Sequence, residues 1–308
     1  MKKIIVGSRR SQLALVQTRH VIGLLEELNP DCQFEIKEIV TKGDKILDIT
    51  LSKVGGKGLF VKEIEQSLLT KEIDFAVHSL KDMPAEMPEG LTLAAVLERE
   101  DPRDCLISTN DYTIDTLPIG AKVGTSSLRR AAQLLSYRND LNTEPLRGNI
   151  NTRLKKLETE NFDAIVLAAA GLNRMGWQDK ITQYLDLDIC IPAVGQGAIG
   201  IQARENDLQL LDILKKINHQ DTRILVSAER AFLDRLQGGC QIPIGAHASF
   251  SGEQIQLVGI VASSDGKVII KEAAKDNKEN VEKLGVQAAE TLLAKGADKI
   301  LAQVKGEL

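Results

Sequence analysis

Two pairs of arginines stand where a predicted strand turns into a predicted helix. One pair closes the run Gly7-Ser8-Arg9-Arg10, and the other closes Gly124-Thr125-Ser126-Ser127-Leu128-Arg129-Arg130. A helix N-terminus offers unpaired N–H groups to an anion and disfavours a nearby cation by roughly 0.3–1 kcal/mol. Cations at both turns therefore predict an anionic ligand. For any one arginine alone, solvation or pairing with a surface carboxylate explains the position equally well.

Three further arginines lie at predicted strand ends and in helices of the second part of the chain: Arg147 after a strand, Arg153 in the next helix and Arg174 at the end of another helix. Because ligands of open α/β sheets bind beyond the carboxyl ends of the strands, we expect these side chains to face one crevice. The planar guanidinium donates two parallel hydrogen bonds to a carboxylate. The arginines together predict a ligand with several carboxylates.

An acidic residue follows another predicted strand, in the run Phe75-Ala76-Val77-His78-Ser79-Leu80-Lys81-Asp82. Loops after strands often hold functional groups, so Asp82 is a candidate for stabilising a cation, with Lys81 as a partner for a carboxylate. An aspartate at such a place is more often a turn or cap residue, and both interpretations stay open. We interpret His78 as structural.

Cys240 follows two glycines at the end of a predicted helix, in Gly238-Gly239-Cys240-Gln241-Ile242-Pro243. An exposed thiol there would be a nucleophile or an attachment point, and the alternative is a small buried hydrophobe, which we predict for Cys32, Cys105 and Cys190. The four cysteines have no CxxC spacing. This pattern argues against a zinc site and a dense disulfide framework and fits a reducing cytoplasm.

A glycine-rich loop carries Lys53 and Lys57 in Ser52-Lys53-Val54-Gly55-Gly56-Lys57-Gly58-Leu59-Phe60. It lacks the pattern GxxxxGK[ST] of a Walker A nucleotide site. A mobile lid and a plain surface turn are equally consistent with its spacing.

Short apolar runs alternate with helical patterns over the first two thirds of the chain, which is typical of an α/β fold. We expect strands at 3–6, 34–40, 73–77, 91–97, 121–124, 143–146 and 164–167, and helices at 12–28, 61–69, 128–137, 152–157 and 168–174. The charged run 98–104 and the glycine-rich run 192–200 are predicted connectors, which would make two hinged lobes. The similar layout of the two arginine turns suggests that the lobes are related.

The last third follows a different pattern. A long helix is expected at 221–236, then strands at 246–250, 255–262 and 267–272, and helices from 281. We predict a small α+β domain here.

The composition excludes several classes of protein. Of 308 residues, 43% are hydrophobic and 27% charged, which is ordinary for a globular protein, and the net charge of -4 gives no basic field for nucleic acid or an anionic membrane. The apolar run after Lys3 is too short for a signal peptide, and no stretch approaches a membrane span. We expect a cytoplasmic protein.

Six motifs occur in order along nearly the whole chain: 7–14, 78–82, 124–130, 146–149, 192–197 and the path from Glu229-Arg230 to Cys240. Together they closely resemble the porphobilinogen deaminase family. The resemblance implies two lobes like those of periplasmic binding proteins, at 1–98 with 198–217 and at 103–193, and a C-terminal domain at 220–308 that anchors the cofactor. Asn151 falls where several members have glycine, and the C-terminal domain matches loosely outside the cysteine loop.

The resemblance also implies a chemistry. A dipyrromethane cofactor would be bound as a thioether to Cys240, and four porphobilinogen molecules would be added head to tail, each losing ammonia. Loss of ammonia leaves a cationic methylene-pyrrolenine, which the carboxylate of Asp82 would stabilise. The family's cofactor-binding positions match Cys240, Lys81, Asp82, Ser127, Arg129 and Arg130, its substrate-binding positions match Arg9, Ser11, Arg147, Arg153 and Arg174, and Lys53 and Lys57 lie on the lid loop.

Two other classes of protein are weighed against this enzyme. A two-lobed anion-binding protein without catalysis would have similar lobes, but it has no use for a Gly-Gly-Cys loop in a third domain. A transcriptional effector domain is disfavoured because no helix-turn-helix or basic region precedes the lobes. We therefore expect an enzyme that acts as a monomer on porphobilinogen and binds no metal, nucleic acid or membrane.

Overall fold

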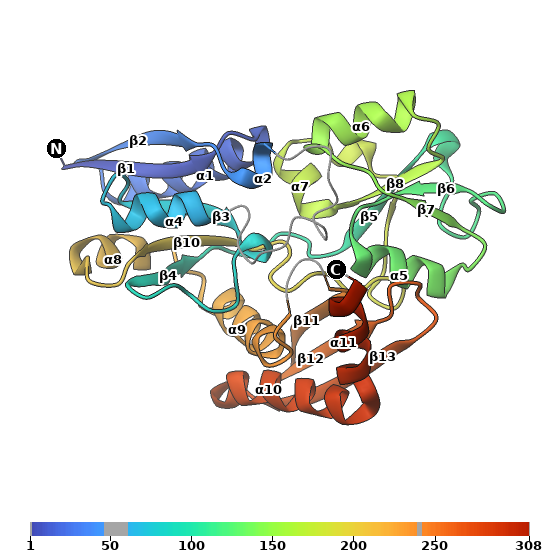
Figure 1. The fold of residues 1–308 in the computed structure, drawn as a ribbon. Coiled ribbons are helices and arrows are strands. Elements are labelled where there is room, and N and C mark those ends of the chain that lie inside the picture. The colour runs from blue at the N-terminus through green and yellow to red at the C-terminus, as the bar shows by residue number, and fades with distance from the viewer. Residues whose placement is uncertain (1, 46–60, 239–241, 308) are drawn as a thin grey trace. The chain divides into compact units, whose positions relative to one another are not determined.

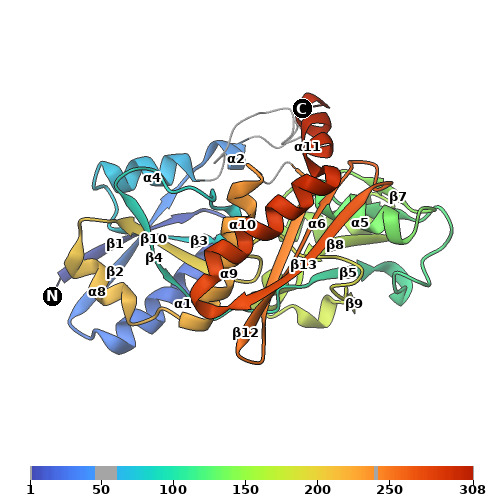
Figure 2. The same cartoon turned by 90° about the horizontal axis from the view of Figure 1, so that it is seen from below.

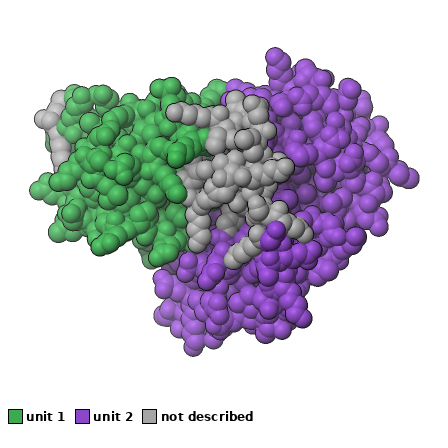
Figure 3. Space-filling model, viewed as in Figure 1, with its two compact units in different colours: residues 1–48, 56–100, 197–223 green, residues 49–55, 101–196, 224–308 purple. Residues whose placement is uncertain are grey.

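The computed structural model describes residues 2–45, 61–238 and 242–307 (Figure 1). The chain divides into two compact units, coloured separately in Figure 3. The first comprises the described residues of 1–48, 56–100 and 197–223, and the second comprises those of 101–196 and 224–308. The second unit contains both the predicted second lobe and most of the predicted C-terminal domain.

The first unit is built on a five-stranded sheet in the order β2-β1-β3-β10-β4. These strands are β1 (Lys2–Arg9), β2 (Cys32–Ile39), β3 (Phe75–Ser79), β4 (Leu91–Val96) and β10 (Ile199–Arg204), and the helices are α1 (Gln12–Leu28), α2 (Lys42–Lys45), α4 (Lys62–Leu69) and α8 (Leu208–Lys215). β1 runs parallel to β2 and β3, whereas β10 runs antiparallel to β3 and β4. The parallel strands bring their carboxyl ends to one edge of the sheet.

Helix α1 illustrates how local sequence builds this unit. The side chain of Ser11 caps its N-terminus by accepting a hydrogen bond from Ala14 N at 3.2 Å. Val21, Ile22 and Leu25 recur at helical spacing and are buried against Phe75 and the other apolar side chains of the sheet. The helix has the bounds that its pattern predicts.

The second unit contains a sheet of the same design in the order β7-β6-β8-β5-β9. Its strands are β5 (Asp104–Ser108), β6 (Lys122–Gly124), β7 (Asn142–Glu144), β8 (Ala164–Ala168) and β9 (Gln183–Tyr184), and its helices are α5 (Leu128–Tyr137), α6 (Ile150–Thr159) and α7 (Ala169–Arg174). As in the first sheet, three parallel strands are followed by an antiparallel fourth. The two sheets therefore share one strand arrangement, in keeping with the similar layout of the two arginine turns.

The rest of the second unit is a three-stranded antiparallel sheet in the order β11-β12-β13. The strands are β11 (Ile244–Ser251), β12 (Gln254–Ala262) and β13 (Ile269–Asn277), and the helices are α9 (Gln220–Arg235), α10 (Val281–Leu292) and α11 (Asp298–Glu307). Figure 2 shows α10 running along the sheet, where Leu284, Ala288 and Leu292 join Phe232 in the core. This confirms the small α+β domain.

Two predicted connectors are shorter than expected. Asp104, the last residue of the predicted connector 98–104, begins β5 and is fully buried. Within the predicted connector 192–200, β10 begins at Ile199 and lies between β3 and β4. Both strands contain buried polar residues, so a search of the sequence for apolar runs does not detect their full length.

Candidate functional site

The carboxyl ends of β1 and β3 meet a small hollow in the first unit. Its polar lining comprises Arg9, Ser11, Gln17, His78, Ser79 and Asp82. Arg9 ends β1, and Asp82 lies in the single 3₁₀ turn Leu80–Asp82 that follows β3. The parallel pairing of β1 with β3 therefore brings together the arginine turn and the aspartate motif, as the sequence predicts.

Arg9 lies between two carboxylates. Its Nη2 is 2.5 Å from Oδ1 of Asp44, whereas its Nη1 is 3.8 Å from Oδ2 of Asp82. Burial acts to raise the pKa of Asp44, but the hydrogen bonds and charge of Arg9, helped by Thr41, outweigh it and hold that pKa below its usual value. Asp44 is thus the closer partner of Arg9, and Asp82 keeps a third of its side-chain surface exposed (33%).

The two hydroxyl residues of this hollow are held by their neighbours. Ser11 caps α1, so its oxygen accepts from the backbone while its O–H stays available as a donor. Gln17, on the inner face of α1, contacts Ser79 through both amide atoms, at 3.0 and 3.1 Å. This contact ties α1 to the end of β3, three residues before Asp82. Lys81 lies in the same turn and is partly buried.

His78 is a buried residue in the wall of the hollow. Burial, followed by the nearby charge of Arg9, lowers its pKa to about 4, so the ring is neutral near pH 7. Its Nε2 is shielded from solvent and meets no hydrogen-bond partner among the described residues. A neutral ring places no second cation beside Asp82.

In the second unit, one buried carboxylate holds both arginines of the second turn. Asp104 Oδ2 is 2.7 Å from Arg129 Nη1, and its Oδ1 is 2.7 Å from Arg130 Nη2. Burial alone would raise the pKa of Asp104, but the charges of Arg129 and Arg130 hold it well below its usual range. Gln196 adds a hydrogen bond to Oδ1 at 2.9 Å. Two arginines share one carboxylate, so these three residues carry one excess positive charge.

Two neighbouring groups fix the arginines without neutralising that charge. The carbonyl oxygen of Ile191 accepts a 2.6 Å bond from Arg129 Nη1, and that of Val166 accepts a 2.9 Å bond from Arg130 Nη1. Burial, aided by the charge of Asp104, raises the pKa of Cys190 to about 12, so this thiol beside Arg129 is neutral. A buried excess positive charge is an unfavourable arrangement unless an anion joins it.

Arg147, Arg153 and Arg174 also belong to the second unit, in the loop between β7 and α6, in α6 and at the end of α7. Arg147 Nε is shielded from solvent and meets no hydrogen-bond partner among the described residues, and burial lowers the pKa of this side chain. Arg153 donates through Nε to Gly148 O at 2.8 Å. Ser127 caps α5 through a 3.5 Å contact with Arg130 N.

The structure thus brings Arg9, Ser11 and Asp82 together in the first unit and Arg129 and Arg130 together in the second. It adds Asp44 and Asp104, which sequence reasoning missed, and it leaves Arg10 exposed beside Glu38 at 3.7 Å. The partner of Arg129 and Arg130 is a buried carboxylate, whereas the alternative weighed from the sequence was a surface one. Three predicted residues, Cys240, Lys53 and Lys57, lie outside the described residues.

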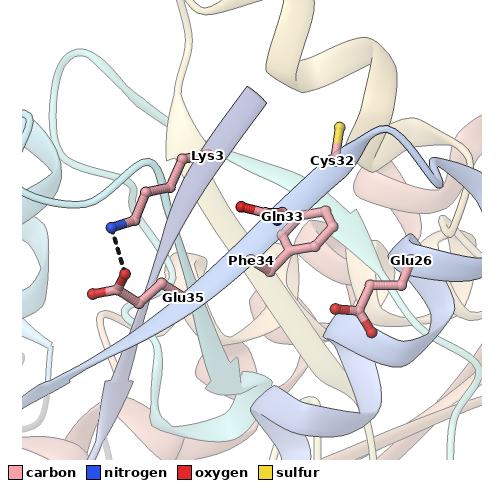
Figure 4. Close-up of a pocket in the computed structure, with 6 residues that line it drawn as sticks. All are labelled: Lys3, Glu26, Cys32, Gln33, Phe34 and Glu35. Carbon is pink, nitrogen blue, oxygen red and sulfur yellow. Dashed lines mark ion pairs between the residues drawn. The ribbon is translucent and has the colours of Figure 1, made fainter. Parts of the chain in front are cut away.

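A second hollow of about 240 Å³ lies at the opposite edge of the first sheet, where β1 and β2 begin (Figure 4). It is lined by Lys3, Glu26, Cys32, Gln33, Phe34 and Glu35. Lys3 and Glu35 form a 2.6 Å ion pair with both side chains more than half exposed. The lining has one lysine against two glutamates, so this hollow has no excess positive charge to attract an anionic ligand.

The donors in the two groups suit a ligand rich in carboxylates. The excess positive charge of the Asp104, Arg129 and Arg130 cluster and the unpartnered Nε of Arg147 both suit an anionic acceptor, and arginine binds carboxylates with two parallel bonds. Within the described residues, no three His, Cys, Asp or Glu side chains gather as a metal site requires. None of the helices in the described part combines the length and hydropathy needed to span a bilayer.

Comparisons with known proteins give consistent matches over the whole chain. The family model "Porphobilinogen deaminase, dipyromethane cofactor binding domain" matches residues 4–212, and "Porphobilinogen deaminase, C-terminal domain" matches residues 223–294. Porphobilinogen deaminase of Bacillus subtilis is 56% identical over 310 residues, covering 100% of this chain and 98% of that protein. The protein of the same name from Brevibacillus brevis is 56% identical over 308 residues, covering 100% and 99%.

Among solved structures, the methionine-binding protein MetQ aligns with a TM-score of 0.46 at 12% identity, covering 71% of this chain and 91% of MetQ. The VFT2 domain of BvgS from Bordetella pertussis aligns with a TM-score of 0.41 at 17% identity, covering 70% of this chain and 86% of the domain.

Proposed function

Because the chain belongs to the porphobilinogen deaminase family, we propose that it condenses four molecules of porphobilinogen head to tail, with loss of ammonia from each, and releases the linear tetrapyrrole hydroxymethylbilane by hydrolysis with one water molecule. The chain is therefore a transferase of tetrapyrrole biosynthesis. The structural observation that best supports this function is the buried cluster of Asp104, Arg129 and Arg130, whose excess positive charge suits an acetate or propionate arm.

The dipyrromethane cofactor, when bound through the Cys240 thioether, supplies the primer on which the tetrapyrrole is extended. We propose that Arg129 and Arg130 bind its carboxylates, with Ser127 and Lys81 as further donors. A carboxylate that reaches Arg129 and Arg130 neutralises the cluster, because Asp104 already balances one of the two positive charges. Asp104 also leaves the arginines no freedom to rotate, so little side-chain entropy is lost on binding.

Arg9, Ser11, Arg147, Arg153 and Arg174 are proposed to hold the carboxylate arms of porphobilinogen and of the growing chain. The Nε of Arg147 is shielded from solvent and meets no acceptor among the described residues. The O–H of Ser11 is not used in capping α1, so it can donate to a carboxylate. Arg9 is shared between Asp44 and Asp82, so a substrate carboxylate that approaches it competes with Asp44.

Asp82 is proposed as the catalytic carboxylate. Positive charge develops on the pyrrole when ammonia leaves, and a fixed carboxylate at hydrogen-bond distance from the pyrrole nitrogens lowers the energy of that state. Two features keep Asp82 effective: Arg9 is bound more closely by Asp44, and the adjacent His78 is neutral. The negative charge of Asp82 is therefore available to stabilise the positive charge that develops on the pyrrole.

We also propose that the chain acts as a monomer in the cytoplasm. Cys105 and Cys190 are free, buried thiols, and Cys32 is free as well, which suits a reducing compartment.

Light scattering on the purified protein tests the oligomeric state: the mass of one chain is expected, and the mass of two would contradict the proposal.

Turnover stoichiometry tests the proposed reaction. Purified protein is incubated with porphobilinogen, and ammonia and tetrapyrrole are measured together. Four ammonia molecules released per hydroxymethylbilane are expected. Binding of porphobilinogen without ammonia release would contradict the proposal and would favour an anion-binding protein without catalysis.

A further inference from the structure

Gly245, the second residue of β11, lies against the backbone of the segment that follows β9. A Cβ atom built on Gly245 would lie 2.9 Å from Ile191 O, 3.0 Å from Pro192 O and 3.2 Å from Arg129 Cδ. Its φ angle is not in the positive region, so other residues can adopt its backbone conformation. Glycine is therefore required here for space.

The close approach is reinforced by hydrogen bonds along the same edge. β11 is the edge strand of its sheet, so every second N–H points outward and lacks a strand partner. Ala246 N donates to Pro192 O at 3.1 Å. Ala248 N donates to Glu229 Oε1 at 2.8 Å, and the other oxygen of Glu229 accepts from Gly195 N at 2.7 Å. The outer edge of β11 is thus docked on residues 191–195.

Arg129 is fixed from both sides at this junction. Asp104 and Ile191 O hold its guanidinium at 2.7 and 2.6 Å, and Gly245 covers its Cδ. Gln133 holds the same carbonyl of Ile191 through Nε2 at 3.1 Å and accepts from Ile191 N at 2.7 Å. The position of Arg129 and the position of β11 are therefore set by the same few atoms.

We propose that Gly245 is a positioning residue for the cofactor, because it lets the backbone of β11 pack directly against Arg129. Cys240 lies five residues before Gly245 in the sequence. This contact therefore fixes the position of Gly245, five residues after the anchoring thiol, relative to an arginine that is proposed to bind the cofactor carboxylates. This inference rests on the proposed function, in which Cys240 attaches the cofactor and Arg129 binds it.

Gly245→Ala tests the proposal, because a methyl group there meets two backbone carbonyls that cannot rotate away. Gly259→Ala is the matched control: Gly259 pairs with Ala246 in the adjacent strand, but its Cβ would meet the ring of Phe232 at 2.5 Å inside the domain core. Intact mass spectrometry gives the fraction of protein that carries the cofactor, and thermal unfolding gives the stability of each variant. Hydrogen exchange reports on the Ala246 amide.

We expect Gly245→Ala to lower the cofactor-loaded fraction at least fivefold and to speed exchange at Ala246, while Gly259→Ala loses thermal stability but stays loaded. Gln133→Met is the second variant. It keeps the volume, adds no atom near Gly245 and removes both bonds to Ile191, so it should lower loading in the same direction. If Gly245→Ala does not fold, the cofactor loading of Gln133→Met decides whether the proposal holds.

Wild-type loading in folded Gly245→Ala, or wild-type loading in Gln133→Met, would overturn the proposal. Equal loss of loading in Gly259→Ala at matched stability would also overturn it, because the effect would then follow stability alone. Failure of the proposed function has a different signature, since wild-type protein would itself carry no added mass.

Discussion

The carboxylate of Asp104 and the guanidinium of Arg129 form a fully buried ion pair with Oδ2 and Nη1 2.7 Å apart. The same carboxylate holds Arg130, so a single negative charge organises two cations in the interior of the second unit. Buried charges are costly to desolvate, and this arrangement is favourable only while each charge has its partners.

Asp104→Asn should therefore destabilise the protein strongly. The substitution keeps the shape of the side chain but leaves two buried arginines without a counter-ion, which costs about 3–5 kcal/mol in comparable buried pairs. Urea unfolding monitored by circular dichroism measures the loss. Glu72→Gln is the control, because Glu72 pairs with Lys37 at an exposed position and should have little effect. A loss as small as that of the control would contradict the assigned role of Asp104.

Asp82→Asn should leave the cofactor attached and lower kcat by roughly 10²–10³-fold, the usual cost of removing one fixed group that stabilises charge in the transition state. Glu86→Gln removes a nearby exposed carboxylate from the same segment and should retain wild-type turnover. Single-turnover measurements on loaded protein separate chemistry from binding. Full activity of Asp82→Asn would show that another group stabilises the cation.

Arg147→Met should weaken substrate binding without lowering stability. The buried Nε of Arg147 has no acceptor in the described structure, so its removal sacrifices no internal hydrogen bond. We expect KM to rise roughly 10–100-fold, as for loss of a hydrogen bond between charged groups, with an unfolding free energy equal to or above that of wild type. Arg138→Met should do the opposite, because Arg138 binds Asp140 and three backbone carbonyls. A wild-type KM in Arg147→Met would remove this arginine from the substrate site.

His78 should make the fold sensitive to acid. Burial lowers the pKa of His78 to about 4 in the folded protein, against an ordinary value of 6.5, so between these pH values the unfolded chain binds a proton that the folded chain does not. Above pH 6.5 the neutral His78 makes its full contribution to the free energy of unfolding. This contribution falls by about 3 kcal/mol as the pH drops towards 4.

His78→Gln should remove that part of the acid sensitivity. Denaturant unfolding at pH 7 and pH 4.5 compares the variant with wild type, and exposed His20→Gln serves as the control. A pH dependence in His78→Gln identical to that of wild type would show that His78 is not buried in its neutral form.

The sequence predicts many elements of both units because these elements have regular patterns and clear caps. The bounds of α1 and α5 are those predicted, and each helix is capped by a serine that marks its start. The Arg9 turn and the Asp82 motif come together because both follow parallel strands. Strand ends and caps are local signals, so one sequence suffices to read them.

The missed features depend on contacts between distant residues. β10 carries Gln202 and Arg204, which look solvent-exposed in sequence but are buried because Glu65, Asp74 and the carbonyls of Leu68 and Ile73 bind them. Asp104 lies in a charged run that resembles a surface connector, and its two arginines are 25 and 26 residues away. A buried charge is recognisable only together with its partners.

The mass of the intact protein tests the central claim most directly. Protein purified without added substrate should be heavier than its sequence by one dipyrromethane, and Cys240→Ser should have the mass of the bare chain, while Cys32→Ser keeps the addition. The wild-type protein should also give the pyrrole colour reaction with Ehrlich's reagent. A wild-type mass equal to that of the bare chain, even after incubation with porphobilinogen, would contradict the account.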